Sequence, residues 1–331
     1  MSTPLPLNEV VVGDAAEQLA RLPEDYVDLV LTSPPYFRLR DYGAAGQLGL
    51  EDDIQQWVAQ LRRVTRQLAR VLTPTGSLWL NLGDSYSTHA REGAPRKSLL
   101  LGPERLLLAL QADGWIVRNK VVWAKTNPVP SPVRDRLATT WEALFFLTRG
   151  PHYFFDLDDI RLPHKTASRR PPGKVTLGRP SGRAAWRGPS GLGASGLERL
   201  RREGRVGHPL GKNPGDVWLL ASARGVAGHH AAFPLSLADR VVRAASPERV
   251  CNQCSAPWTP AGAPTCDCGT PSRRGRVLDP FLGSGTTAVA ADLLGRDWLG
   301  IDLNPEYAAR AAERVQRAGA GTQERPPPTK P

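Results

Sequence analysis

The sequence contains no apolar run long enough to cross a lipid bilayer, which takes about 20 residues. Its N-terminus also lacks the basic start and apolar stretch of a secretory signal peptide. These two absences argue against a membrane protein and a secreted protein, and they favour a cytoplasmic location. With 331 residues the chain can bury a large core, and one α/β domain with a sizeable insertion is the simplest organisation.

Cysteine is also scarce, and all four cysteines lie in one short stretch: Cys251, Cys254, Cys266 and Cys268. In a cytoplasmic protein, such closely spaced pairs favour a four-thiolate zinc site over disulfides, with free thiols as the alternative. Four thiolates leave no open coordination position on the metal. We therefore expect a small structural zinc knuckle over residues 251–270.

A glycine-rich turn follows a predicted strand near the C-terminus, within residues 277–287. A helix pattern comes next, and then a short strand over 298–301 that ends on Asp302. This order describes a nucleoside-binding βαβ unit, in which glycines let the backbone approach the ligand and the carboxylate takes the ribose hydroxyls. Ala288 stands where a dinucleotide fingerprint has its third glycine, so a nucleoside without phosphates is the better ligand.

Ser33-Pro34-Pro35-Tyr36 directly follows an apolar strand pattern over 26–31. The prolines have a fixed φ and no N–H, so their carbonyls can point outward as acceptors. Ser33 adds a short polar group, and Tyr36 adds an aromatic face. Such a pocket suits a planar ring that carries an amino group, and a nucleobase flipped out of a duplex fits that description. The alternative is that the prolines merely end the strand.

Positive charge is concentrated between Arg161 and Lys212, where 13 Lys and Arg face only two acidic residues. This stretch therefore carries a charge of +11, which equals the net charge of the whole chain. It is rich in Gly, Pro and Ser, a composition typical of a disordered basic insertion. Such a segment can also neutralise phosphates and send Arg or Lys to guanine edges. We favour a target-recognition region over residues 161–215, and both interpretations hold if it orders only on DNA.

Thr32-Ser33-Pro34-Pro35-Tyr36 and the segment Asp279 to Thr287 together resemble the catalytic and cofactor motifs of one family. These are the amino-group DNA methyltransferases that use S-adenosylmethionine. The catalytic motif comes first here, which is similar to the circularly permuted group called beta. The resemblance covers roughly residues 8–318. It implies a doubly wound, mostly parallel seven-stranded methyltransferase sheet, and methylation of a flipped base in double-stranded DNA, as in restriction-modification systems.

The resemblance also assigns roles to single residues. Ser33 Oγ and the Pro34 carbonyl would accept the amino hydrogens, Tyr36 would stack on the base, and Pro35 belongs to the same catalytic motif. For Trp123 and Lys125, a place in the strand core and at its solvated end, respectively, is as consistent as a role in the base pocket. The residues expected to bind the cofactor are Asp14 (adenine end), Asp302 (ribose), Asp279, Phe281, Gly283, Ser284, Gly285, Thr286, Thr287 and Phe233 (in the segment that closes over the cofactor).

The target base depends on Ser33, because a serine at the first position of this motif leans toward N4 of cytosine. Aspartate or asparagine at that position leans toward N6 of adenine, which stays an alternative. Methylation of a cytosine ring carbon uses a Pro-Cys dipeptide, and none of the four cysteines follows a proline. An RNA or protein methyltransferase and a non-catalytic DNA-binding protein also stay open, as does the choice between monomer and homodimer.

These interpretations divide the chain into six parts. They are a catalytic half (1–160), the basic target-recognition insertion (161–215), a cofactor-closing segment (216–250), the zinc knuckle (251–270), a cofactor-binding half (271–318) and a disordered tail (319–331). Hydrophobic spacing predicts helices over 54–72, 101–112, 234–244 and 306–317, with Pro74 and Gly76 ending the first. Further strands are predicted over 9–12, 77–82, 116–124 and 143–148.

Overall fold

The computed structural model of the chain describes residues 5–164, 208–223 and 233–322. The described residues fall into two compact units, one within Met1–Asp156 and Gly215–Pro331 and the other within Leu157–Pro214. The smaller unit contains the 3-10 helix η2 (Asp158–Ile160) and an antiparallel bridge between Leu162 and Lys212. Most of the predicted target-recognition insertion lies outside the described residues, and so do residues 224–232 of the predicted cofactor-closing segment.

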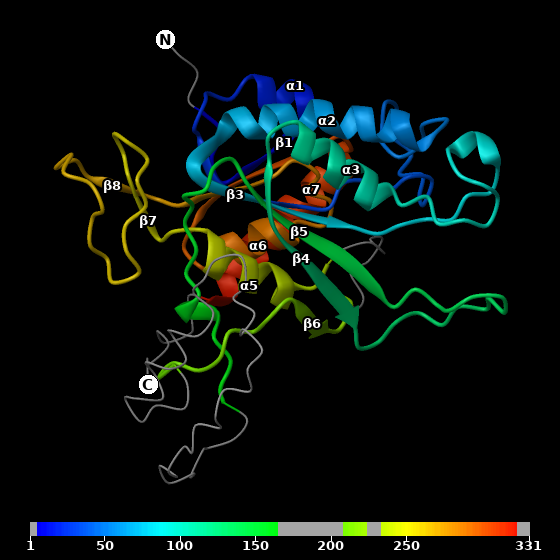
Figure 1. The fold of residues 1–331 in the computed structure, drawn as a ribbon. Coiled ribbons are helices and arrows are strands. Elements are labelled where there is room, and N and C mark those ends of the chain that lie inside the picture. The colour runs from blue at the N-terminus through cyan, green and yellow to red at the C-terminus, as the bar shows by residue number, and fades with distance from the viewer. Residues whose placement is uncertain (1–4, 165–207, 224–232, 323–331) are drawn as a thin grey trace, which may run out of the picture. The chain divides into compact units, whose positions relative to one another are not determined.

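Eight strands of the larger unit form one sheet in the order β1-β10-β9-β2-β3-β5-β4-β6 (Figure 1). The strands are β1 (Glu9–Val12), β2 (Val27–Thr32), β3 (Leu72–Leu82), β4 (Ile116–Lys125), β5 (Trp141–Thr148), β6 (Val217–Leu220), β9 (Arg276–Asp279) and β10 (Asp297–Asp302). Only β5 runs antiparallel to its two neighbours, β3 and β4. The predicted α/β fold with a large, mostly parallel sheet is confirmed.

The predicted number of seven strands is wrong, because β6 adds an eighth strand beside β4. This edge strand has four residues, and only Trp218 among them is buried. One buried residue gives no alternation that hydrophobic patterning could detect. Strands β4 and β5 confirm the strands predicted over 116–124 and 143–148, and they pair antiparallel.

Helices cover both faces of the sheet, and one apolar core lies on each side of it. One core packs against α1 (Ala15–Ala20), α2 (Ile54–Val71) and α3 (Gly102–Ala112). The other packs against α5 (Leu235–Ala245), α6 (Thr286–Leu293) and α7 (Pro305–Thr322). Figure 1 shows α2 and α3 on one side and α5 and α6 on the opposite side. The short 3-10 helix η1 (Ala90–Glu92) follows β3. None of the helices in the described ranges is long and apolar enough to span a membrane.

Helix α2 ends earlier than Pro74 and Gly76 suggested. The helix stops at Val71, and β3 starts at Leu72 and continues through both residues. The β2–β3 register shifts here, from Val27 opposite Leu72 to Leu29 opposite Ser77. Such an irregularity tolerates a proline inside a strand, because a ladder hydrogen bond is already missing.

Helix α7 is longer than the predicted helix over 306–317. It begins at Pro305 and ends at Thr322, so the prediction of a disordered tail from residue 319 is wrong over 319–322. Residues 323–331 lie outside the described residues. Gly319 does not end the helix, although glycine often does.

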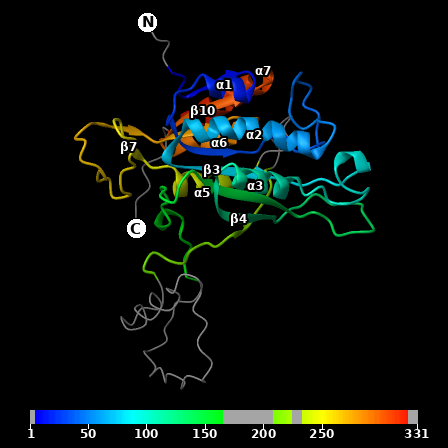
Figure 2. The same cartoon turned by 45° about the horizontal axis from the view of Figure 1, so that its top comes forward.

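A two-stranded hairpin brackets the cysteine-rich segment. Strand β7 (Arg249–Cys251) pairs antiparallel with β8 (Ser272–Arg274), and both views show the hairpin (yellow) extending from one side of the sheet (Figures 1 and 2). Arg273 of β8 places Nη1 2.5 Å from Oδ2 of Asp28, a buried carboxylate of the central strand β2. An ion pair at this depth is costly to break, because the remaining charge is left uncompensated. The hairpin is therefore fastened to the strand that leads to Ser33.

Candidate active site

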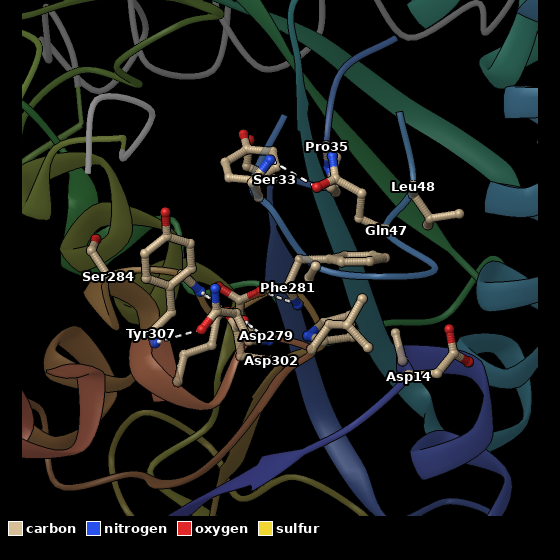
Figure 3. Close-up of a pocket in the computed structure, with 18 of the residues that line it drawn as sticks. Asp14, Ser33, Pro35, Gln47, Leu48, Asp279, Phe281, Ser284, Asp302 and Tyr307 are labelled. Carbon is tan, nitrogen blue, oxygen red and sulfur yellow. Dashed lines mark hydrogen bonds between the residues drawn. The ribbon is translucent and has the colours of Figure 1, made fainter. Parts of the chain in front are cut away.

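A cavity of about 940 Å³, counting the part open to solvent, lies at the carboxyl ends of β1, β10, β9 and β2. These four strands are sheet neighbours and run parallel, so the loops that follow them meet at one edge. Figure 3 shows Ser33 and Pro35 on one side, Asp279 and Asp302 on the other, and Phe281 between them. The N-terminal and C-terminal motifs therefore share one cavity.

Most of the site residues predicted from the sequence line this cavity. They are Asp14, Ser33, Pro35, Phe233, Asp279, Phe281, Gly283, Ser284, Thr286 and Asp302. Four others do not line it: Pro34, Tyr36, Gly285 and Thr287. Of these, Tyr36, Gly285 and Thr287 hold their neighbours in place.

Asp302 faces the cavity in a fixed orientation. Its Oδ2 accepts a hydrogen bond from the backbone N–H of Gly283 at 2.8 Å, and its Oδ1 accepts one from Asn304 N at 2.9 Å. Burial raises the pKa of Asp302, and these two backbone hydrogen bonds oppose the rise. Gly283 has φ +52°, in the left-handed region that favours glycine. The glycine turn and the carboxylate thus form one rigid unit.

Gly285 and Thr287 support the turn from behind. Gly285 has φ +80°, and a Cβ on it would lie 3.1 Å from Cβ of Ala311 in α7. The lack of a side chain therefore lets α6 and α7 pack closely. Thr287 Oγ1 donates to Asp279 Oδ2 at 2.7 Å and also lies 3.2 Å from the carbonyl oxygen of Leu31.

Asp279 connects the two motifs directly. Its Oδ1 accepts from Thr32 Oγ1 at 2.6 Å and from the backbone N–H of Phe281 at 3.1 Å, while Oδ2 accepts from Thr287. Only 3% of the residue is exposed. Burial raises the pKa of Asp279 to about 6, although the hydrogen bonds from Thr32 and Thr287 act in the opposite direction.

The segment from Ser33 to Tyr36 differs from the prediction in the direction of one proline carbonyl. Pro35 O accepts a hydrogen bond from Trp57 Nε1 at 2.9 Å, so the idea that both proline carbonyls point outward is wrong for Pro35. Tyr36 lies with its ring against Gly83, where a Cβ would come within 2.7 Å of ring carbon Cε2. The Tyr36 hydroxyl lies 3.1 Å from Ser33 Oγ, which itself lines the cavity.

Asp14 and Phe233 both line the cavity, although they lie far apart in the sequence. Asp14 caps α1, because its Oδ1 accepts from the backbone N–H of Glu17 at 3.0 Å. Phe233 is buried and lies directly before α5. A capping carboxylate and an aromatic side chain can hold the polar and apolar parts of a nucleoside.

One loop that lines the cavity was not predicted from the sequence. Tyr42, Gln47 and Leu48 line it, together with Asn304 and Tyr307 from the segment after β10. The backbone N–H of Tyr42 donates to Gln47 Oε1 at 2.7 Å, which closes the loop on itself. The three glycines between residues 43 and 49, all with positive φ, were the available signal for such a loop.

The four cysteines form a cluster. One sulfur atom from each of Cys251, Cys254, Cys266 and Cys268 lies within 4.8 Å of the other three. Tetrahedral zinc with Zn–S bonds of about 2.3 Å sets its thiolates about 3.8 Å apart, so the cluster fits such an ion. A hydrogen bond from Thr270 lowers the pKa of Cys251 to about 6, whereas the neighbouring Cys254 and Cys266 raise the pKa of Cys268 to about 12.

Comparison with known proteins gives consistent results. A family model of DNA methylases matches residues 27–313. The type II methyltransferase M.SfiI of Streptomyces fimbriatus is 33% identical, over 89% of this chain and 88% of its own length. M.SmaI of Serratia marcescens is also 33% identical, over 93% and 91%.

Two solved structures share the fold. PvuII DNA methyltransferase, described as cytosine-N4-specific, superposes with a TM-score of 0.58 at 18% identity, covering 94% of this chain and 90% of the other. A putative DNA modification methylase of Thermus thermophilus, complexed with S-adenosyl-L-methionine, gives a TM-score of 0.54 at 25% identity, covering 95% and 96%.

The raised pKa of Asp279 predicts a specific pH dependence of stability. Its folded pKa of about 6 exceeds the usual unfolded value near 3.9, so its contribution is fully present below pH 4 and is lost as pH rises through 6. Asp279→Asn should remove this dependence. The amide can donate to Thr287, whose hydroxyl then donates to Leu31 O.

Urea unfolding at pH 4 to 7 measures this effect. The stability of the variant relative to the wild type should rise by about 2 to 3 kcal/mol between pH 4 and pH 7. If the free energy of unfolding changed with pH in the same way for both proteins, the assignment of a raised pKa to Asp279 would be contradicted.

Proposed function

Because this chain belongs to the DNA methylase family, we propose that it transfers a methyl group from S-adenosylmethionine to N4 of a flipped cytosine in duplex DNA. The observation that carries the proposal is the single cavity that joins Ser33 to the Gly283 turn. Methyl transfer needs the acceptor and the donor side by side, and a shared cavity provides this.

The residues of the cavity suit S-adenosylmethionine. Asp302 uses each carboxylate oxygen for one backbone N–H, and the remaining lone pairs can accept from the ribose hydroxyls. Asp14, Phe281 and Gly283 line the cavity, and we assign Asp14 to the adenine end and Phe281 with the turn at Gly283 to the methionine side.

S-adenosylmethionine supplies a sulfonium methyl group to this reaction. The chain supplies position and hydrogen bonds. Ser33 lines the cavity, and its Oγ can accept a hydrogen of the exocyclic amino group, which directs the nitrogen lone pair toward the methyl carbon. The family resemblance is the support for Pro34 O as the second acceptor and Tyr36 as the aromatic wall beside the base, because neither residue lines the cavity in this structure.

The choice of cytosine over adenine depends on Ser33. A serine in this position leans toward N4 of cytosine, and the solved PvuII enzyme that shares the fold is described as cytosine-N4-specific. The matching family model covers N6 as well as N4 methylases, so N6 of adenine is the second candidate.

DNA contact is assigned to the basic segment 161–215. Its charge of +11 between Arg161 and Lys212 is the support for this assignment, because phosphate neutralisation dominates affinity for DNA. The larger unit would then serve the chemistry, and the insertion would serve recognition of the site.

We also assign a structural zinc ion to the four cysteines. The support is the spacing of their sulfur atoms. The ion would stiffen the hairpin of β7 and β8. Through the pair of Arg273 with Asp28, that hairpin is fastened to the strand that leads to Ser33.

The methylated nucleoside tests the function. Amplified, unmethylated duplex DNA is incubated with tritiated S-adenosylmethionine and digested to nucleosides, and N4-methylcytosine is the expected product. Ser33→Ala should bind S-adenosylmethionine within twofold of the wild type and transfer methyl groups about 100-fold more slowly, since it loses a transition-state acceptor. Ser98→Ala removes an exposed serine and serves as the control.

Labelled N6-methyladenine would overturn the choice of base alone. Absence of label in the DNA would overturn the proposed function. A Ser33→Ala variant with the wild-type rate would show that the acceptor of the amino hydrogens lies elsewhere.

Elemental analysis tests the zinc site. The purified protein should hold one zinc per chain, and Cys254→Ser should hold none and unfold at a temperature lower by more than about 5 °C. Gln253→Ser changes an exposed neighbour that carries no thiol and should match the wild type. Zinc-free wild-type protein with the same melting temperature after treatment with a chelator would refute the site.

A further inference from the structure

A polar network beside the cavity ends at Ser33 and extends across three neighbouring strands. The Tyr36 hydroxyl lies 2.7 Å from Glu142 Oε2 in β5 and 3.2 Å from Asn81 Oδ1 in β3. Glu142 Oε1 is paired with Lys125 Nζ at the end of β4, at 2.5 Å. Strands β3, β5 and β4 are adjacent in the sheet, so the network spans all three strands (Figure 1).

The orientation of each acceptor in this network is determined by a second bond. Asn81 is buried and donates from Nδ2 to the carbonyl oxygen of Ala143 at 3.1 Å, so its Oδ1 faces Tyr36. Lys125 holds the other oxygen of Glu142, so Oε2 faces Tyr36 as part of a charged carboxylate. Tyr36 therefore has two hydrogen-bond acceptors in front of its hydroxyl and no donor from either side chain.

The Tyr36 hydroxyl keeps its single hydrogen. Burial is the larger cause that raises its pKa well above the ordinary value, and the charge of Glu142 adds to it. That hydrogen must go to Glu142 or to Asn81, and Glu142 is the closer and charged acceptor. The bond between Ser33 and Tyr36 then requires Ser33 as the donor.

This polarity leaves Ser33 as a pure acceptor toward the cavity. Its only hydrogen points to Tyr36, so the lone pairs of Oγ face the space where a base would lie. An amino group satisfies these lone pairs, whereas a carbonyl oxygen would meet them with no hydrogen between. Two acceptors that meet in a buried site without a hydrogen between them cost binding free energy. The network therefore favours an amino-bearing base over one with a carbonyl at the same position.

We propose that Glu142, Asn81 and Lys125 are positioning residues that act through Tyr36. Together they make Ser33 a hydrogen-bond acceptor for the target amino group, and Glu142 receives the proton that this group loses. The proposal rests on the proposed function and deepens it. None of these three residues lines the cavity, so each acts through a neighbour.

The proton balance of the transfer closes along the same network. The amino nitrogen uses its lone pair for the new bond to the methyl carbon, and the electrons of the broken carbon–sulfur bond stay on sulfur. The nitrogen then carries one surplus proton. Ser33 Oγ takes this proton and passes its own to Tyr36, which passes its own to Glu142 Oε2. The neutral Glu142 side chain is 16% exposed and can return the proton to solvent.

Single-turnover methylation of amplified duplex DNA tests the network. Glu142→Gln is isosteric but loses the charge and faces Tyr36 with an amide N–H, because Lys125 holds the amide oxygen. Tyr36→Phe keeps the ring and removes the hydroxyl. Each should slow the transfer about 10- to 100-fold, the effect of losing a hydrogen bond to a charged group. Affinity for S-adenosylmethionine, measured by calorimetry, should stay within twofold and shows that the variants are folded.

The double variant separates a linked role from two independent ones. If Glu142 acts through the Tyr36 hydroxyl, Tyr36→Phe with Glu142→Gln should be no slower than the slower single variant. Glu104→Gln is the matched control, because it breaks a glutamate–lysine pair with Lys120 on the same strand β4. It should transfer at the wild-type rate.

The outcomes distinguish this proposal from the proposed function. A wild-type protein that labels DNA, together with a Glu142→Gln variant of equal rate, would overturn the network alone. Multiplying effects in the double variant would also overturn it, since Glu142 would then act apart from Tyr36. A wild-type protein that labels no DNA would overturn the function and the proton route with it.

Discussion

The site depends on one buried carboxylate, Asp279. It accepts hydrogen bonds from Thr32, which directly precedes Ser33, and from Thr287 in the first turn of α6. The two threonines belong to motifs about 250 residues apart, yet one side chain holds both. Burial raises the pKa of Asp279, so its carboxylate destabilises the fold when it is charged at neutral pH. The same carboxylate keeps the end of β2 beside the glycine turn. This contact determines the distance between the two halves of the cavity.

The strand order explains how such distant segments meet. Strands β9 and β10, from the end of the chain, are inserted between β1 and β2 from its beginning. All four are parallel, so their carboxyl ends deliver Asp14, Ser33, Asp279 and Asp302 to one edge. On the other side of β2, the strands β3, β5 and β4 bring Asn81, Glu142 and Lys125 to Tyr36. In the function we propose, one half of the sheet binds the methyl donor and the other half directs the hydrogen bonds of the base.

Local patterns in the sequence predicted the elements and the two motifs, because spacing and turn residues are visible along the chain. Strand β6 was missed because a short edge strand buries only Trp218, and Pro74 was misjudged because the β2–β3 irregularity depends on a partner strand. The roles of Gly285 and Thr287 follow from contacts with Ala311 and Asp279, which leave no local signal. The network behind Ser33 needed coordinates for the same reason, since Tyr36 and Glu142 are 106 positions apart.

The most direct test of this account removes one hydroxyl next to Ser33. Thr32→Val takes away the donor to Asp279 Oδ1 and leaves all cavity-lining side chains in place. The account predicts unchanged affinity for S-adenosylmethionine in calorimetry, within twofold, and single-turnover methylation of duplex DNA slowed by about tenfold or more. Thr65→Val, at a buried threonine of α2 away from the cavity, should leave the rate unchanged. A Thr32→Val enzyme with full rate would contradict the dependence of the site on Asp279.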